Sequence, residues 1–163
     1  MAKRLLVAVD DSDASRRAVH YVGFLAGMIT DLHSTLLHVR PGASPYGEDA
    51  AREQDPSAGS GPKHFEDGRE GASAALLRRF RMLLEGMGGQ VQRIEAVSRT
   101  CQEGVAKTIL DYGYETRCDA IVAGRRGLSS LKTAFLGSVS STLFEQSFAL
   151  PIWIAGSETP NQR

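Results

Sequence analysis

Short apolar runs alternate with longer segments of helical periodicity along most of this chain. The runs at residues 4–10 (RLLVAVD), 34–39 (STLLHV) and 119–124 (DAIVAG) contain few polar residues, as strands buried on both faces do. Residues 90–98 and 151–155 have the length of two further strands. Strands that alternate with helices pair in parallel, because each helix crosses a face of the sheet and returns the chain to the starting edge of the next strand. The pattern therefore predicts an α/β fold, a three-layer sandwich with helices on both faces of a mainly parallel sheet.

The segments between these strands carry the signals of helices. Ser12 or Asp13 can cap the first helix, and Gly88 with Gly89 ends the second. Residues 138–147 suit a short last helix. The apolar positions expected to face the sheet are Ala18, Val22, Leu25, Ala26 and Ile29 in the first helix, Leu76, Phe80, Leu83, Leu84 and Met87 in the second, Val105, Ala106, Ile109 and Leu110 in the third, and Val139, Leu143 and Phe144 in the last.

Composition limits the number of domains and the classes of partner. A chain of 163 residues is most simply one domain, here residues 1–157 with a tail at 158–163. Residues 41–63 hold four of the six prolines and predict a long polar loop. Nineteen basic and nineteen acidic side chains cancel, which argues against nucleic acid or a membrane surface as partner. Two cysteines without metal-ligand spacing suggest reduced thiols and a cytoplasmic protein, and no apolar run is long enough to span a membrane.

The stretch GRRGLSSLKTAFLGS, residues 124–138, lies where the fourth predicted strand ends. In sheets of this kind ligands bind at the carboxyl ends of the strands, where Asp10 and Val39 are also expected. Gly124 and Gly127 are expected to turn with positive φ and to let the backbone approach a ligand. The helix opened by Gly137 would direct its free amides at an anion. The hydroxyls of Ser138 and Ser140 would add to these amides, and Arg125, Arg126 and Lys132 would add positive charge.

Several other interpretations of these residues stay open. The glycines can serve tight turns only, with Ser138 as a simple N-cap. The DDSD cluster after the first strand can be a helix cap with one ligand contact, or a metal cage. His38 is expected to be structural rather than a catalytic base, and the charged face of the second helix, with Arg79, is expected to be solvated. No Walker A loop is present.

Four segments together resemble the universal stress protein family: LLVAVDDSDAS, LLHV, DAIVAGRRGLSSLKTAFLGSVSSTL and LPIWIA. The resemblance implies a five-stranded parallel sheet in the order 3-2-1-4-5, of the adenine nucleotide alpha hydrolase-like type. It also implies membership of the ATP-binding branch, whose Gly-x2-Gly-x9-Gly-(Ser/Thr) pattern is present here. The implied nucleotide site contains Ala8, Val9, Asp10, Val39, Ala123, Gly124, Arg125, Gly127, Gly137, Ser138, Val139 and Ser140. In it Asp10 contacts the ribose, and Ala8, Val9 and Val39 lie near adenine.

The expected function is that of an ATP-binding, stress-response regulatory module, with Mg²⁺ as a candidate companion of ATP. Two alternatives remain: a slow ATPase or self-phosphorylating enzyme that uses the same crevice, and a dimeric adaptor that binds no nucleotide. No robust turnover is expected, since Asp10 is the one obvious candidate base. The apolar last strand would be an exposed edge. The sequence therefore predicts a homodimer through residues 151–156, with Trp153 near the interface.

Overall fold

The computed structural model describes residues 2–40, 42, 62–101, 103–125 and 137–156. They form a sheet of five strands in the order β3-β2-β1-β4-β5, and every strand pair is parallel. This is the predicted topology. The strands are β1 (Lys3–Ala8), β2 (Leu32–Arg40), β3 (Ile94–Thr100), β4 (Ala120–Gly124) and β5 (Ile152–Ala155).

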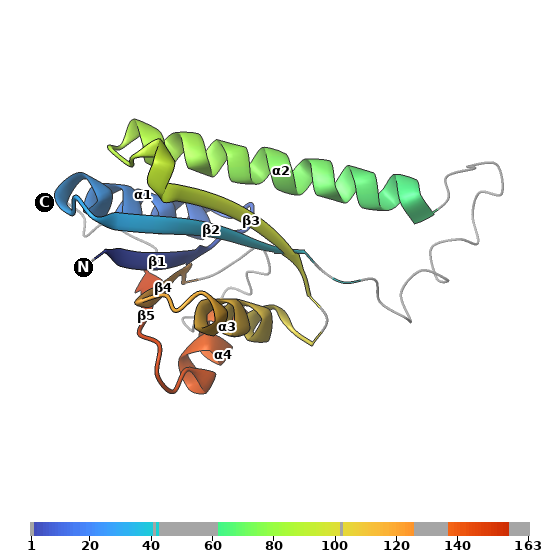
Figure 1. Ribbon diagram of the computed structural model, residues 1–163. Coiled ribbons are helices and arrows are strands. Elements are labelled where there is room, and N and C mark those ends of the chain that lie inside the picture. Colours follow the sequence, from blue (N-terminus) through green and yellow to red (C-terminus); the bar gives the residue numbers. More distant parts are fainter. Residues whose placement is uncertain (1, 41, 43–61, 102, 126–136, 157–163) are drawn as a thin grey trace, which may run out of the picture.

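Helices cover both faces of the sheet (Figure 1). On one face lie α1 (Asp13–Met28) and α2 (Pro62–Gly86); on the other lie α3 (Val105–Glu115) and α4 (Ser138–Gln146). Each face has its own apolar core. Phe80 and Leu84 of α2 pack against one side of the sheet, and Leu110 and Leu143 of α3 and α4 pack against the other. The central strands are therefore buried on both sides, which explains why their sequences read as apolar runs.

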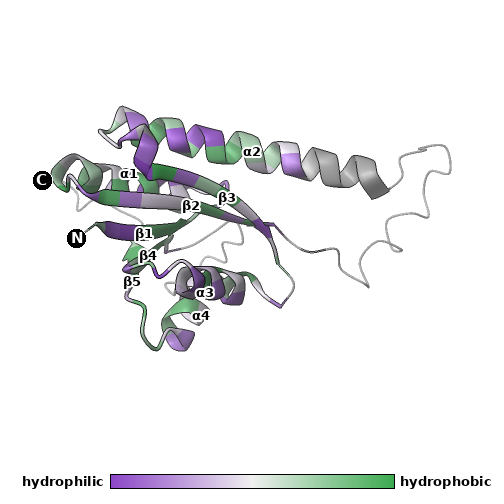
Figure 2. Cartoon of the chain, in the orientation of Figure 1, coloured by the Kyte–Doolittle hydropathy of each residue, from purple (hydrophilic) through white to green (hydrophobic). Residues whose placement is uncertain are grey.

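The helix boundaries follow from capping and from backbone conformation. Ser12 is the N-cap of α1, because its side chain accepts a hydrogen bond from the amide of Ser15. The helix α2 begins at Pro62, well before the apolar stripe that predicted it, and Pro suits a first helical position. Along this helix hydrophobic and hydrophilic residues alternate (Figure 2). Gly88 lies just beyond its end with φ of 104°, a conformation that favours glycine, so the predicted stop is confirmed.

Three expectations about packing and register are wrong. Ile29, which was expected to face the sheet, is 37 % exposed, because it is the C-cap just beyond the last residue of α1. Phe144 was expected to face inward, but it is 68 % exposed. In a helix of nine residues the buried stripe passes through Ser140 and Leu143, so the adjacent Phe144 falls outside it. The edge strand β3 begins at Ile94 rather than at residue 90, because Val91–Arg93 form a 3-10 turn first. Most of the predicted loop at 41–63 lies outside the described residues. Within the described residues, no helix is long and apolar enough to cross a membrane.

Candidate functional site

The carboxyl ends of three neighbouring strands bring the predicted site residues together. Ala8 at the end of β1 is paired with Leu37 of β2 on one side and with Ala123 of β4 on the other. The amide of Val9 donates to the carbonyl of Leu37 at 2.9 Å, which carries the strand pairing one residue further. Asp10 therefore follows the central strand directly at this edge, between Val39 of β2 and Gly124 of β4.

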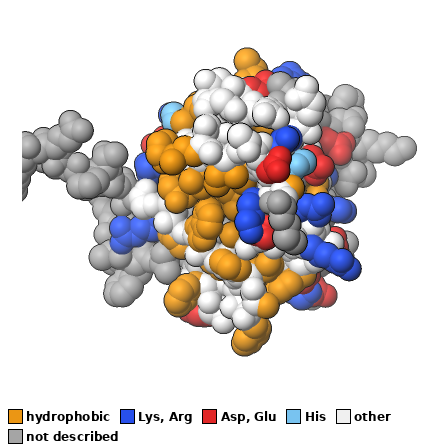
Figure 3. All heavy atoms as spheres, turned by 60° about the vertical axis from the view of Figure 1, so that its left-hand side comes forward, with side chains coloured by type: hydrophobic (Ala, Val, Ile, Leu, Met, Phe, Trp, Pro, Cys, Tyr) orange, Lys and Arg blue, Asp and Glu red, His pale blue; other side chains and the backbone are white. Residues whose placement is uncertain are grey.

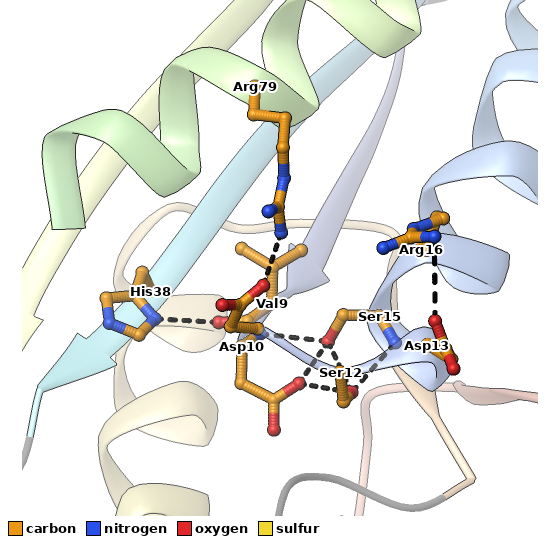
Figure 4. Close-up of polar contacts among 9 residues, drawn as sticks. Val9, Asp10, Ser12, Asp13, Ser15, Arg16, His38 and Arg79 are labelled. Atoms are coloured by element: carbon orange, nitrogen blue, oxygen red, sulfur yellow. Dashed lines mark hydrogen bonds and ion pairs between the residues drawn. The ribbon is translucent and has the colours of Figure 1, made fainter. Parts of the chain in front are cut away.

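The carboxylate of Asp10 is held by the first turn of α1 (Figure 4). The hydroxyls of Ser12 and Ser15 donate to its Oδ1 at 2.5 and 2.6 Å. The Asp10 amide in turn donates to Ser15 Oγ at 2.8 Å. Ser15 is 4 % exposed, so this network is shielded from water on one side. A buried network of this kind fixes the direction of the carboxylate before any ligand arrives.

Gly124 allows α1 to pack closely against the end of β4. A Cβ at this position would lie 2.6 Å from both C and Cβ of Ala14 and 2.8 Å from its carbonyl oxygen. The expected positive φ is not found: within the described chain the positive-φ glycines are Gly88 and Gly104. The absence of a side chain at position 124 therefore serves helix–strand contact in the first place, and not a left-handed turn.

The N-terminus of α4 lies beside Gly124. Gly137 is the N-cap and its amide donates to the Arg125 carbonyl at 2.9 Å. No side chain caps this helix, and Gly137 has φ −65° and ψ 159°, which any L-residue can adopt. Ser138 is thus the first helical residue and not an N-cap, contrary to the alternative considered above. Among the described residues no side chain caps the first amides of α4, at a helix end that attracts negative charge.

Ser140 joins the two ends of the glycine-containing segment. Its hydroxyl donates to the carbonyl of Gly124 at 2.7 Å, and the side chain is 4 % exposed. The hydroxyl proton of Ser140 is therefore engaged in a hydrogen bond within the protein. An anion would bind the backbone amide of Ser140 rather than its hydroxyl. Gly127, Arg126 and Lys132 lie outside the described residues.

Comparison with known proteins shows the family of this chain. The model of the universal stress protein family matches residues 1–150. The chain belongs to the universal stress protein family. A search of curated proteins finds no match.

Solved structures of this family share the fold over nearly the whole chain. The hypothetical protein MJ0577 is 18 % identical, with a TM-score of 0.74 over 98 % of this chain and 99 % of that one. A universal stress protein in complex with cAMP is 19 % identical, with a TM-score of 0.65 over 96 % and 98 % of the two chains. A universal stress protein from Archaeoglobus fulgidus in complex with dAMP is 18 % identical, with a TM-score of 0.61 over 93 % and 96 %.

The acidic cluster after β1 is divided among separate partners. Asp11 accepts a hydrogen bond from Arg79 of α2 at 2.6 Å, and Asp13 lies 3.6 Å from Arg16. The hydrogen bond from Arg79, followed by its positive charge, lowers the pKa of Asp11. No group of three His, Cys, Asp or Glu side chains placed to hold a metal occurs in the described part of the chain. The cluster thus caps α1 and ties its first loop to α2, which supports the helix-cap interpretation.

His38 has the structural contact that was expected of it. Its Nδ1 lies 2.9 Å from the carbonyl oxygen of Val9, as Figure 4 shows. Because a carbonyl only accepts, Nδ1 carries the proton in this contact. The ring therefore joins β2 to the residue just before Asp10.

Sequence reasoning missed two residues that shape this site. Ser15 is one: the Ser12-x-x-Ser15 spacing, which places both hydroxyls on the first helical turn, was the available signal. Arg79 is the other, since its pairing with Asp11 joins residues that are 68 positions apart. A charged residue on a helix surface gives no sequence signal of its partner across such a separation.

We expect the Ser15→Ala variant to lower the free energy of unfolding by about 1–3 kcal/mol. The Asp10 amide would lose its acceptor at 2.8 Å, and Asp10 Oδ1 would lose one of its two serine donors. Urea denaturation measures the change. Ser141→Ala is the matched control, because among the described residues that hydroxyl donates to the exposed Glu145 side chain alone, at 3.1 Å. The stability of this variant should stay within about 0.5 kcal/mol of the parent. Equal stability of the two variants would show that the Asp10 network contributes nothing.

Proposed function

We propose that this universal stress protein binds an adenine nucleotide, specifically ATP, at the carboxyl edge of the sheet and acts as a nucleotide-dependent regulatory module of the stress response. One observation carries the proposal: the fixed carboxylate of Asp10 and the uncapped N-terminus of α4 lie at the same edge, one on each side of Gly124. A carboxylate accepts hydrogen bonds from ribose hydroxyls, and free helical amides bind phosphate. Neighbouring structures of the family hold cAMP and dAMP, which supports an adenine nucleotide as ligand.

Each predicted residue has a role in this proposal. The adenine would lie against Ala8, Val9 and Val39, and the ribose would contact Asp10. The phosphates would meet the backbone of residues 137–140, with Ala123, Gly124, Arg125 and Gly127 around them. Mg²⁺ that accompanies ATP would be held mainly by phosphate oxygens. A cytoplasmic location belongs to the same proposal, and the free thiols of Cys101 and Cys118 agree with it.

Nucleotide release and calorimetric titration test this function. The native protein, purified without added nucleotide, is denatured and the supernatant is analysed by chromatography for ATP and AMP. Titration of nucleotide-free protein with ATP, AMP and cAMP then gives the affinities. Asp10→Asn should weaken binding by about tenfold to a hundredfold, since a charged acceptor is lost. Asp13→Asn should bind like the parent, because Asp13 is exposed and its partner within the described chain is Arg16, on the same helix. If no nucleotide is released and none binds, the adaptor function replaces this proposal.

A homodimer through β5 is the second part of the proposal. Within the described residues this strand pairs with β4 alone and lies at the sheet edge. It carries exposed aromatic surface, since Trp153 is 38 % exposed and packs edge-to-face on Tyr21 at 6.2 Å. An apolar strand at a sheet edge invites pairing, and a second copy across a two-fold axis would cover it.

We expect sedimentation to show a dimer at tens of micromolar, on the order of the concentrations at which such interfaces associate. Trp153→Glu should give a monomer, because two like charges would be brought together near the axis. Met82→Glu is the control: Met82 is also exposed, at 64 %, but lies on α2, the helix over β2 and β3. A parent protein that sediments as a monomer would refute the interface.

A further inference from the structure

A cavity lies at the opposite edge of the sheet from the proposed nucleotide site. It has a volume of about 520 Å³ and opens between the amino ends of β1, β2 and β3 and the carboxyl end of α3. Cavities of this size accommodate small organic ligands. Figure 3 faces the amino ends of the strands and shows basic side chains, acidic side chains and a histidine close together beside an apolar area.

Arg117 lines this cavity in a conformation that favours glycine. Its φ is 51°, and it is the one non-glycine residue with positive φ in the described chain. It ends α3 in a Schellman motif, in which the amide of Cys118 donates to Gly113 at 3.1 Å and that of Arg117 to Tyr114 at 3.2 Å. A side chain at this position costs stability, and its guanidinium makes no hydrogen bond or ion pair with a described residue. Strained residues of this kind are concentrated at binding sites.

Two carboxylates face the same cavity without pairing with Arg117. Glu95 comes from β3 and Glu115 from the last turn of α3, and neither forms an ion pair among the described residues. Both carboxylates act on the phenol of Tyr112. Burial raises the pKa of this phenol most, the negative charges of Glu95 and Glu115 raise it further, and the positive charge of Arg99 lowers it. The other two arginines at the rim are already engaged, Arg4 with the Thr116 carbonyl at 3.4 Å and Arg93 with Asp31 at 2.8 Å.

The floor of the cavity is uncharged. Leu6 and Cys118 form it, and burial raises the pKa of the Cys118 thiol to about 11, so the thiol is neutral at physiological pH. An anion alone would meet two carboxylates and the negative end of the α3 dipole, while a cation alone would meet Arg117, with Arg4, Arg93 and His33 also in the lining. A molecule with both charges, joined by a short apolar chain, would pair with Arg117 and with the two carboxylates.

We propose that this cavity binds a small zwitterion, with its carboxylate on Arg117 and its ammonium group on Glu95 and Glu115. The site is separate from the nucleotide crevice, and the inference does not depend on the proposed function. Unpaired charges of both signs around an apolar floor fix the orientation of such a ligand. The distance between its two charges sets the affinity.

A series of amino acids with increasing charge separation tests the site: glycine, β-alanine, 4-aminobutyrate and 6-aminohexanoate, titrated into the full chain by calorimetry. One chain length should bind best, and butyrate and butylamine, which each carry one of the two charges, should bind at least about tenfold more weakly. The inference is overturned if no member of the series binds, or if a singly charged analogue binds as well as the best zwitterion.

Arg117→Gly separates binding from stability. It should weaken binding of the best zwitterion by at least about tenfold. It should also raise the melting temperature by about 2–4 °C, because glycine adopts this φ without strain. Arg117→Asn, whose side chain tolerates the same conformation, should lose binding as well. Glu115→Gln should weaken binding. Glu103→Gln, just before the N-cap of α3 and outside the cavity, should not. An Arg117→Gly protein that binds like the parent would refute the role of this arginine.

Discussion

Gly137→Val is expected to abolish nucleotide binding while the protein stays folded. Gly137 has φ −65° and ψ 159°, so valine fits its backbone conformation, and the hydrogen bond from its amide to Arg125 can be kept. The branched side chain would instead stand beside the free amides of α4, where the proposed site places phosphate. Since valine is a poorer N-cap than glycine, we expect a loss of about 1 kcal/mol at most, or about 2–4 °C in melting temperature.

Calorimetric titration with ATP, run beside thermal melts, checks this result. Ser138→Ala should weaken binding by about tenfold to a hundredfold, the effect of one hydrogen bond to a charged group. Gly86→Val is the control for a glycine-to-valine change away from the site, and it should bind ATP like the parent. A Cβ at position 86 would meet nothing within 4 Å. A folded Gly137→Val protein that binds ATP like the parent would mean that α4 does not receive the phosphates.

Gly124→Ala is expected to have its large effect on stability instead. The new Cβ would lie 2.6 Å from two atoms of Ala14, one of them backbone, so α1 or β4 must move. Overpacking of a tight core contact costs about 1–3 kcal/mol. At about 2–4 °C for each kcal/mol in a chain of this size, the melting temperature should fall by several degrees. Because the Gly124 carbonyl accepts the Ser140 hydroxyl at 2.7 Å, the movement should also shift α4.

Differential scanning calorimetry measures this loss, and a double-mutant cycle assigns it to the contact. Ala14→Gly removes the Cβ of Ala14 but leaves its backbone C and O, 2.6 and 2.8 Å from the new atom. The Gly124→Ala and Ala14→Gly double variant should therefore recover only part of the stability. Gly156→Ala, which meets nothing within 4 Å, should melt like the parent. If Gly124→Ala also melts like the parent, the close packing of α1 on β4 is not required.

The two glycines show what the sequence could and could not reveal about the site. Their placement at the end of β4 and at the start of α4 followed from the alternation of strands and helices, and Ser12 was one of two candidate caps. The strand order was implied by the resemblance to the universal stress protein family. The reason for Gly124 was not, because the distance from β4 to Ala14 depends on how α1 crosses the sheet. The Arg79–Asp11 and Ser140–Gly124 contacts are likewise products of tertiary packing, which periodicity does not encode.

Phe144 and Arg117 illustrate the same limit at single positions. An aromatic residue next to a buried leucine reads as core, yet the short α4 leaves Phe144 exposed. The apolar spacing predicted α3 but not its last residue, and a position after a helix end that glycine normally occupies is occupied here by arginine, with φ 51°. Sequence patterns describe the typical residue at each position, so they miss the residues that depart from it.

The central position of β1 has a consequence for synthesis of the chain on the ribosome. Leu5 of β1 pairs with Ala120 of β4, which is 115 residues later, whereas its partner in β2 is Ser34. At about 5–20 residues per second, roughly 6–23 s pass before β4 is made. During that time β1, β2 and β3 can form half of the sheet, with α1 and α2 on one face and one edge of β1 open. We therefore expect the newly made N-terminal half to be the species that chaperones bind, because an apolar strand edge stays exposed until β4 arrives.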